Sequence, residues 1–224
     1  MSAIVALTAQ NTTGVTAVHE APVEFVRAQL EAVFADIGVD AAKTGMLFSR
    51  ELIEAVADFL DGRDVPLVVD PVMVASSGAK LLQDDAVATL VARLFPLATV
   101  VTPNLPEAEV LANGSSSRRE LAERIHALGA AAVVVTGGHG DAVDHLFDGE
   151  RHVEIPVARH DVAATHGAGC THSATLAAYI AKAWPLEDSA RAAAAAASGA
   201  VAHGLVELGR GEGPVDVLDV KGAA

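Results

Sequence analysis

An α/β fold with a mostly parallel central sheet is predicted by three features of the sequence. Apolar, β-branched runs alternate along the chain with segments of helical spacing. Two of these runs, residues 66–70 and 131–136, are almost continuously apolar, which is typical of strands buried on both faces. The last helical segments are rich in alanine, as expected of closely packed helices. The alternation predicts helices on both faces of the sheet.

The expected elements follow one another in a regular order. Strands are expected at residues 3–7, 39–43, 66–70, 98–102, 131–136, 143–147 and 152–157. Helices are expected at residues 23–37, 51–60, 84–94, 118–128, 174–183 and 191–206. The short polar spacer between the last two strands predicts a hairpin that adds antiparallel edge strands. Because residues 3–7 are apolar throughout, we expect them to form an interior strand of the same sheet. No linker or repeat is visible, so residues 1–224 are predicted to form a single domain.

Composition narrows the class of function. A hydrophobic content of 51% in 224 residues supports a large core. The net charge of −14 argues against a nucleic-acid partner and repels anionic substrates over long range. The single cysteine precludes an internal disulfide and fits a reducing compartment, and no apolar run reaches the roughly 20 residues of a membrane span. We therefore expect a cytoplasmic protein that binds small molecules and contacts neither nucleic acid nor membrane.

The most informative segment is residues 166–173, where two glycines and Cys170 precede the expected helix at 174–183. Unpaired N–H groups and the helix dipole at such a start attract anions, and glycines let a phosphate approach the backbone. The same field favours a thiolate, so we expect the pKa of Cys170 to be lowered. Taken alone, the segment also fits a glycine-rich N-cap followed by a small buried cysteine.

Polar residues follow the other expected strands, at the edge where open α/β sheets bind ligands. Each has an ordinary explanation: Gln10 as a solvated loop amide, Lys43 as a surface lysine, and Asp70 as part of a strand stop. Asn104 and Glu107 fit the N-cap and third helical residue of a capping box. They can also present oxygens, together with Asp70, to a hydrated Mg²⁺ ion. Combined with an anion site at the same edge, this set favours phosphoryl transfer.

These motifs resemble those of the hydroxymethylpyrimidine and phosphomethylpyrimidine kinases of thiamine biosynthesis, within the ribokinase-like superfamily. The matching stretches are residues 7–12, 43–47, 69–73, 102–108, 137–139 and 165–171. Cysteine at position 170 is specific, since many sugar kinases of the superfamily carry aspartate there, whereas pyrimidine and some pyridoxal kinases carry cysteine. The resemblance implies a three-layer α/β/α sandwich and an enzyme that uses ATP as co-substrate with Mg²⁺, and it is compatible with a homodimer.

The reaction that the resemblance implies has two steps. The γ-phosphoryl group of ATP passes to the hydroxymethyl of 4-amino-5-hydroxymethyl-2-methylpyrimidine, and a second transfer converts the monophosphate to the diphosphate. The implied site residues are Cys170 as base, with Gly167, Ala168 and Gly169 completing the anion hole; Gln10, Met46, Val72 and Met73 for the pyrimidine; Thr136, Gly138 and Thr165 for the nucleotide; and Asp70, Asn104 and Glu107 for Mg²⁺.

The chain departs from the family pattern in three places. Ala168 stands where the family often has threonine, and Thr136 where many members have lysine, which would weaken contact with the nucleotide phosphates. Family members also begin with a strand and a Gly/Asp-rich substrate loop that nothing in these residues matches. Either the start site was chosen too late or the chain is a truncated relative. In both cases we expect an N-terminally truncated version of the fold that is aggregation-prone or weakly active when expressed alone.

Three other interpretations are compatible with the sequence. A pyridoxine or pyridoxal kinase shares the cysteine-containing loop and accepts similar ring alcohols. A non-catalytic, ligand-binding relic of the family would bind nucleotide or pyrimidine without turnover. A metal site formed by His166, Cys170 and His172 is the third, although the sequence offers no fourth ligand for it.

Overall fold

One six-stranded sheet forms the centre of the computed structural model, which describes residues 1–73, 81–138 and 140–220. Its strands lie in chain order: β3 (Ala42–Thr44), β4 (Leu67–Val69), β5 (Val100–Val101), β6 (Val133–Val135), β7 (Val143–Phe147) and β8 (His152–Pro156). Neighbouring strands are parallel from β3 to β6 and antiparallel from β6 to β8. The mostly parallel sheet and its antiparallel edge hairpin are therefore confirmed.

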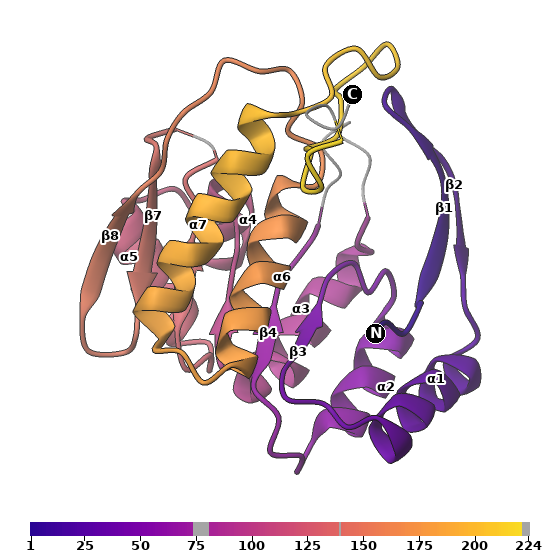
Figure 1. The fold of residues 1–224 in the computed structure, drawn as a ribbon. Coiled ribbons are helices and arrows are strands. Elements are labelled where there is room, and N and C mark those ends of the chain that lie inside the picture. The colour runs from indigo at the N-terminus through magenta and orange to yellow at the C-terminus, as the bar shows by residue number, and fades with distance from the viewer. Residues whose placement is uncertain (74–80, 139, 221–224) are drawn as a thin grey trace.

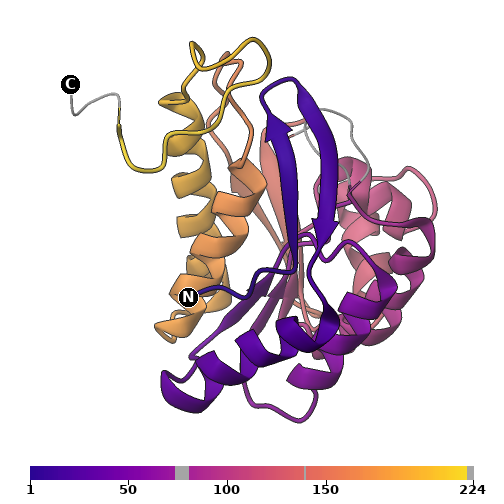
Figure 2. The same cartoon turned by 90° about the vertical axis from the view of Figure 1, so that its right-hand side faces the viewer.

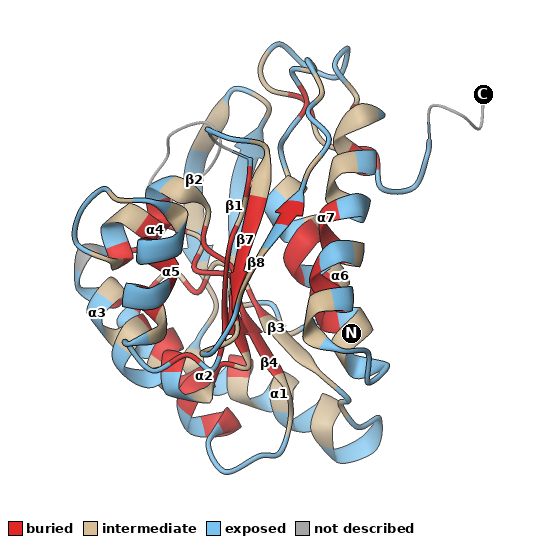
Figure 3. Ribbon diagram, turned by 90° about the vertical axis from the view of Figure 1, so that its left-hand side faces the viewer, coloured by how far each residue is buried: buried red, intermediate tan, exposed pale blue. Residues whose placement is uncertain are grey.

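Helices cover both faces of this sheet (Figure 1), and the buried strands lie between the two helical layers (Figure 3). One face carries α1 (Val23–Asp36), α2 (Arg50–Leu60), α3 (Asp84–Arg93), the short 3-10 helix η1 (Phe95–Leu97), α4 (Leu105–Leu111) and α5 (Arg118–His126). The other face carries α6 (Ala168–Ala181) and α7 (Leu186–Ala202). The three-layer α/β/α sandwich is confirmed. Among the described residues, no helix combines the length and apolar character needed to cross a membrane.

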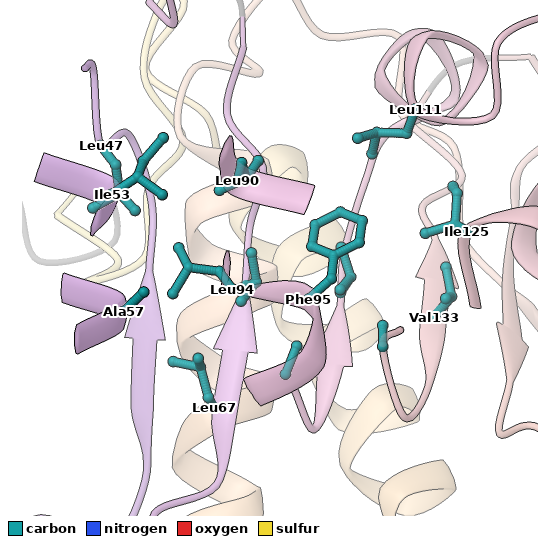
Figure 4. Close-up of a cluster of buried hydrophobic side chains, with 14 of the residues drawn as sticks. Leu47, Ile53, Ala57, Leu67, Leu90, Leu94, Phe95, Leu111, Ile125 and Val133 are labelled. Atoms are coloured by element: carbon teal, nitrogen blue, oxygen red, sulfur yellow. The ribbon is translucent and has the colours of Figure 1, made fainter. Parts of the chain in front are cut away.

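The sheet strands divide their side chains between two apolar cores. Leu67 and Val69 of β4 join the core beneath α1 to α5, whereas Val68 between them joins the core beneath α6 and α7. Figure 4 draws part of the first core, including Leu67, Leu94 and Phe95. Successive side chains of a strand point to opposite faces, so a strand covered on both sides must be apolar at every position.

The prediction of an interior strand at residues 3–7 is wrong. β1 (Ala6–Asn11) pairs antiparallel with β2 (Gly14–Glu20) in a separate two-stranded sheet beside the central one (Figure 2). The Oδ1 atom of Asn11 accepts hydrogen bonds from the N–H groups of Thr13 (2.9 Å) and Gly14 (3.2 Å), which fixes the turn. The apolar character of residues 3–7 suggested a buried strand. The turn from Asn11 to Gly14, which lies between two segments with β-branched residues, is the signal that predicts a hairpin instead.

The hairpin is tied to the body of the protein at both ends. At its tip, Oγ1 of Thr12 accepts hydrogen bonds from the N–H groups of Arg210 and Gly211, each at 3.2 Å. At its base, the hydroxyl of Ser49, the N-cap of α2, donates to the carboxylate of Glu20. The hairpin therefore connects the start of α2 to the C-terminal loop.

Candidate active site

The carboxyl ends of the parallel strands bring polar residues from distant parts of the sequence to one edge. The N–H of Asp70 donates to the carbonyl of Thr44 at 3.0 Å, and the N–H of Thr102 donates to the carbonyl of Val69 at 2.9 Å. Thr136 forms an isolated parallel bridge with Asn104. The strand-end residues singled out from the sequence therefore lie along one edge of the sheet, with the exception of Gln10, which is in β1.

The helix expected to bind an anion begins earlier than predicted. α6 starts at Ala168, and Gly167 is its N-cap with φ of 90°, a left-handed conformation that favours glycine. Gly169 and Cys170 lie in the first turn, where N–H groups lack intrahelical acceptors. The prediction placed the start at residue 174 because the alanine-rich run begins there. The earlier start puts the cysteine inside the helical N-terminus, as an anion hole requires.

Lys43 is a candidate functional residue that the sequence analysis left as a surface lysine. It lies on β3, and its half-buried Nζ is 3.8 Å from Oδ2 of Asp70. The same Oδ2 accepts a hydrogen bond at 2.8 Å from the hydroxyl of Ser173, in α6. The sequence signal for a functional role of Lys43 was its position at the carboxyl end of a short strand, two residues before Gly45. The ammonium group provides positive charge at an otherwise acidic edge.

The predicted lowering of the Cys170 pKa is wrong. Cys170 is exposed at the site, yet desolvation by the surrounding protein raises the pKa of its thiol. Lys43 opposes this by lowering that pKa, whereas the carboxylates of Asp70 and Glu107 raise it further. The helix start was visible in the sequence, whereas Asp70 follows β4 and Glu107 lies in α4. The expected lowering took account of the helix start alone, although both carboxylates were expected at the same edge of the sheet.

Asn104 and Glu107 form the capping box at the start of α4. The side chain of Asn104 accepts from the N–H of Glu107 at 2.9 Å, and Oε2 of Glu107 accepts from the N–H of Asn104 at 3.0 Å. The other carboxylate oxygen of Glu107 accepts from the N–H of Met73 at 3.2 Å. Both carboxylate oxygens are thus used. A glutamine would present only one acceptor oxygen to these two donors.

The residues at this edge fit a hydrated divalent cation better than a directly ligated one. Burial raises the pKa of both Asp70 and Glu107, and the charge of Asp70 raises that of Glu107 further. Among the described residues, no group of three or more His, Cys, Asp or Glu side chains could hold a metal ion. The hydroxyls of Thr44 and Thr102 are buried without a hydrogen-bond partner in the described part of the chain. A Mg²⁺ ion that keeps its waters would offset the carboxylate charge and could supply those partners.

The predicted nucleotide and pyrimidine residues are distributed around this edge. Gly138 follows β6, and the hydroxyl of Thr165, before α6, donates to Glu212. Met73 is buried below the edge, whereas Met46 and Val72 are half-buried. Gln10 lies in β1, where its side-chain oxygen accepts a 3.3 Å hydrogen bond from Thr8. These roles stay predictions, and His139 of the matching motif lies outside the described residues.

The proposed metal site of His166, Cys170 and His172 does not form in the described part of the chain. Nε2 of His172 is instead 3.0 Å from a carboxylate oxygen of Asp144. The backbone of His166 pairs with residues 213–215 through a bridge to Pro214. These two histidines therefore serve other contacts.

A mostly parallel sandwich with a glycine-capped helix start, a cysteine in its first turn and buried carboxylates at the same edge defines a ribokinase-like phosphotransferase. Over residues 1–216 the sequence matches the family described as phosphomethylpyrimidine kinase. The chain belongs to this family.

Individual relatives agree with this placement. The chain is 48% identical over 223 residues to the hydroxymethylpyrimidine/phosphomethylpyrimidine kinase of Rhizobium meliloti, covering 96% of this chain and 84% of that protein. It is also 48% identical to the thiamine biosynthesis bifunctional protein ThiED of Geobacter sulfurreducens, of which it spans only 45%. The pyridoxal kinase of Bacillus subtilis, solved as an ADP complex, is 35% identical with a TM-score of 0.88, covering 99% of this chain and 87% of that one.

Proposed function

We propose that the chain phosphorylates 4-amino-5-hydroxymethyl-2-methylpyrimidine with ATP, and then phosphorylates the monophosphate to the diphosphate, in thiamine diphosphate biosynthesis. The observation that carries this proposal is the convergence of Cys170, Lys43 and Asp70 at the N-terminus of α6. The family and the Rhizobium relative support the pyrimidine as substrate. The ADP complex of the similar pyridoxal kinase supports a nucleotide as the phosphoryl donor.

In this mechanism the protein acts mainly by positioning and by stabilising charge. The hydroxymethyl oxygen forms a bond to the γ-phosphorus as the bond from phosphorus to the ADP oxygen breaks. The hydroxyl proton passes to the thiolate of Cys170. The first-turn N–H groups of α6 and the ammonium of Lys43 stabilise the charge that develops on the transferring group. A raised thiol pKa makes the thiolate a stronger base but a less abundant one.

Mg²⁺ supplies further positive charge to the ATP phosphates when it is bound. We assign Asp70, Asn104 and Glu107 to its hydrated shell, Thr136, Gly138 and Thr165 to the nucleotide, and Gln10, Met46, Val72 and Met73 to the pyrimidine. Residues 1–224 would act as one kinase domain. The unpaired cysteine fits the cytoplasmic location that we propose. A homodimer stays a prediction.

The test is steady-state kinetics of Cys170→Ala beside ADP binding by calorimetry. We expect kcat to fall by about 10²- to 10⁴-fold, since a general base contributes that much, while ADP affinity changes little. A folded Cys170→Ala protein with unchanged kcat would remove Cys170 from the mechanism.

Comparing kcat/KM for two substrates separates the pyrimidine kinase from the pyridoxal kinase alternative. The value of kcat/KM should be higher for the pyrimidine alcohol than for pyridoxal. The opposite order would establish the pyridoxal kinase alternative, which the similarity to the Bacillus enzyme makes the second candidate. Binding of ADP with no turnover of either alcohol would establish the relic.

A further inference from the structure

A buried carboxylate connects two segments to which the proposed function assigns phosphate contacts. Asp144 lies on β7 and is 2% exposed. Its Oδ1 accepts a 2.6 Å hydrogen bond from the N–H of Gly137, in the loop that follows β6. Its Oδ2 lies 3.0 Å from Nε2 of His172, which is 4% exposed and stands two residues after Cys170 in α6. One side chain therefore contacts both the loop and the helix.

The loop is held against β7 by packing as well as by this hydrogen bond. A Cβ at Gly137 would lie 2.7 Å from backbone atoms of Val143, so no other residue fits there without movement. The preceding residue, Thr136, donates its N–H to the carbonyl of Pro103 at 2.9 Å. Through this bond the loop is also fixed to the segment that precedes the capping box of α4.

The hydrogen bonds of Asp144 with Gly137 and His172 place polar groups in the protein interior, and burying such groups costs free energy. Because Nε2 of His172 bonds to Asp144, the other ring nitrogen, Nδ1, is buried without a partner among the described residues. Buried polar atoms are usually satisfied, and apolar side chains of similar shape can replace a buried hydrogen-bonded pair without loss of stability. Such a pair therefore calls for a role besides stability.

We propose that Asp144 is a positioning residue for phosphoryl transfer, which fixes the nucleotide loop at residues 136–138 relative to the N-terminal turn of α6. The two segments can then contact the same chain of phosphates together. The inference rests on the proposed function, because that function assigns nucleotide contacts to both segments. Asp144 acts through Gly137 and His172 and needs no contact with substrate.

The principal variant is Asp144→Asn, which keeps the shape of the side chain. An amide offers one oxygen and one NH₂ group to two donors, so one of the two connections is lost or must be rearranged. We expect ADP affinity and kcat/KM for ATP to fall about tenfold or more, with little change in KM for the pyrimidine. Hydrogen exchange should become faster in residues 136–138 and 168–172.

Asp148→Asn is the matched control. Asp148 lies in the turn between β7 and β8, and its carboxylate accepts hydrogen bonds from the N–H groups of Glu150 and Arg151. The substitution is the same and lies in the same hairpin, but at the opposite end of β7. It should leave nucleotide binding, turnover and exchange in the two segments unchanged.

Two substitutions at His172 decide the question if Asp144→Asn fails to fold. His172→Gln keeps an N–H donor toward Asp144 and should retain ADP affinity near the wild-type value, whereas His172→Leu removes the donor and should lower it. Unchanged ADP affinity, kcat and exchange in folded Asp144→Asn or folded His172→Leu would overturn the proposal. Hydrogen exchange requires no turnover, so it tests the connection even if the protein proves not to phosphorylate the pyrimidine.

Discussion

The charge around Cys170 shows how a single residue depends on neighbours that are remote in the sequence. Three charged groups act electrostatically on its thiol: Lys43 from β3, Asp70 after β4 and Glu107 in α4. The sequence placed the cysteine at a helix start and so predicted a lowered pKa. Desolvation, the largest cause, and two acidic neighbours outweigh one lysine and raise the pKa instead. Lys43 is thus the cation that limits the rise in the pKa of Cys170.

A direct measurement of the Cys170 thiol follows from this balance. Alkylation by iodoacetamide requires the thiolate, and Cys170 is the sole cysteine, so the rate reports its ionisation. Because the pKa is raised, the rate should increase with pH through a midpoint above that of a free thiol. In Lys43→Met, which lacks the lowering contribution, the midpoint should move to still higher pH. EDTA in the buffer keeps divalent cations out of the measurement.

Two further variants make this test specific. A Cβ at Gly45 would lie 2.9 Å from Nζ of Lys43, so Gly45→Ala should displace the ammonium and shift the midpoint in the same direction. Lys182→Met removes a lysine beyond the opposite end of α6 and should have no effect. Equal midpoints in wild type and Lys43→Met would show that Lys43 does not influence the thiol.

At the level of elements, the residue pattern predicted most elements of the sandwich. It failed at the hairpin, gave no range for α4, and placed the starts of α6 and α7 six and five residues too late. Strands buried on both faces and amphipathic helices leave periodic signals that a single sequence contains. The hairpin of β1 and β2 lies outside the central sheet, so the apolar character of residues 3–7 did not indicate an interior strand. The start of α6 depends on Gly167 adopting a positive φ, which local helix propensity does not report.

The hairpin should influence pyrimidine binding through its contact with the C-terminal loop. A Cβ at Gly211 would overlap the carbonyl oxygen of Thr12, so Gly211→Ala should move the hairpin tip away from the loop. Because we place Gln10 in the pyrimidine site, this variant should raise KM for the pyrimidine severalfold while KM for ATP changes less. Steady-state kinetics with each substrate varied in turn provides the measurement.

Gly199→Ala offers a matched control for that substitution. A Cβ at Gly199, within α7, would meet no atom within 4 Å in the described structure, and alanine favours a helix interior. It should preserve both KM values and maintain or increase stability. If Gly211→Ala folds with an unchanged KM for the pyrimidine, the hairpin tip does not affect the substrate.

At the level of the whole molecule, family motifs and strand order were sufficient to predict the sandwich and the kinase family. Those motifs are local in sequence, and the carboxyl ends of parallel strands necessarily meet at one edge. Contacts that depend on packing between elements were not predictable. The Asp144 connection to Gly137 and His172 joins three segments, none of which contains a motif for it.

The overall charge provides a prediction at the same scale. A net charge of −14 repels an anionic substrate at distances where the local positive groups of the site are not yet felt. The first proposed substrate is a neutral alcohol and the second is its anionic monophosphate, so repulsion acts on the second alone. Added salt shortens the Debye length from about 30 Å at 0.01 M to about 10 Å at 0.1 M. Raising the salt over this range, with Mg²⁺ and ATP saturating, should therefore increase kcat/KM for the monophosphate and leave that for the alcohol nearly constant.

A decrease in kcat/KM for the monophosphate would instead mean that the positive field of Lys43 and the α6 N-terminus dominates its approach. Because both substrates react at the same site, the ratio of the two kcat/KM values cancels effects of salt on the nucleotide and on the fold.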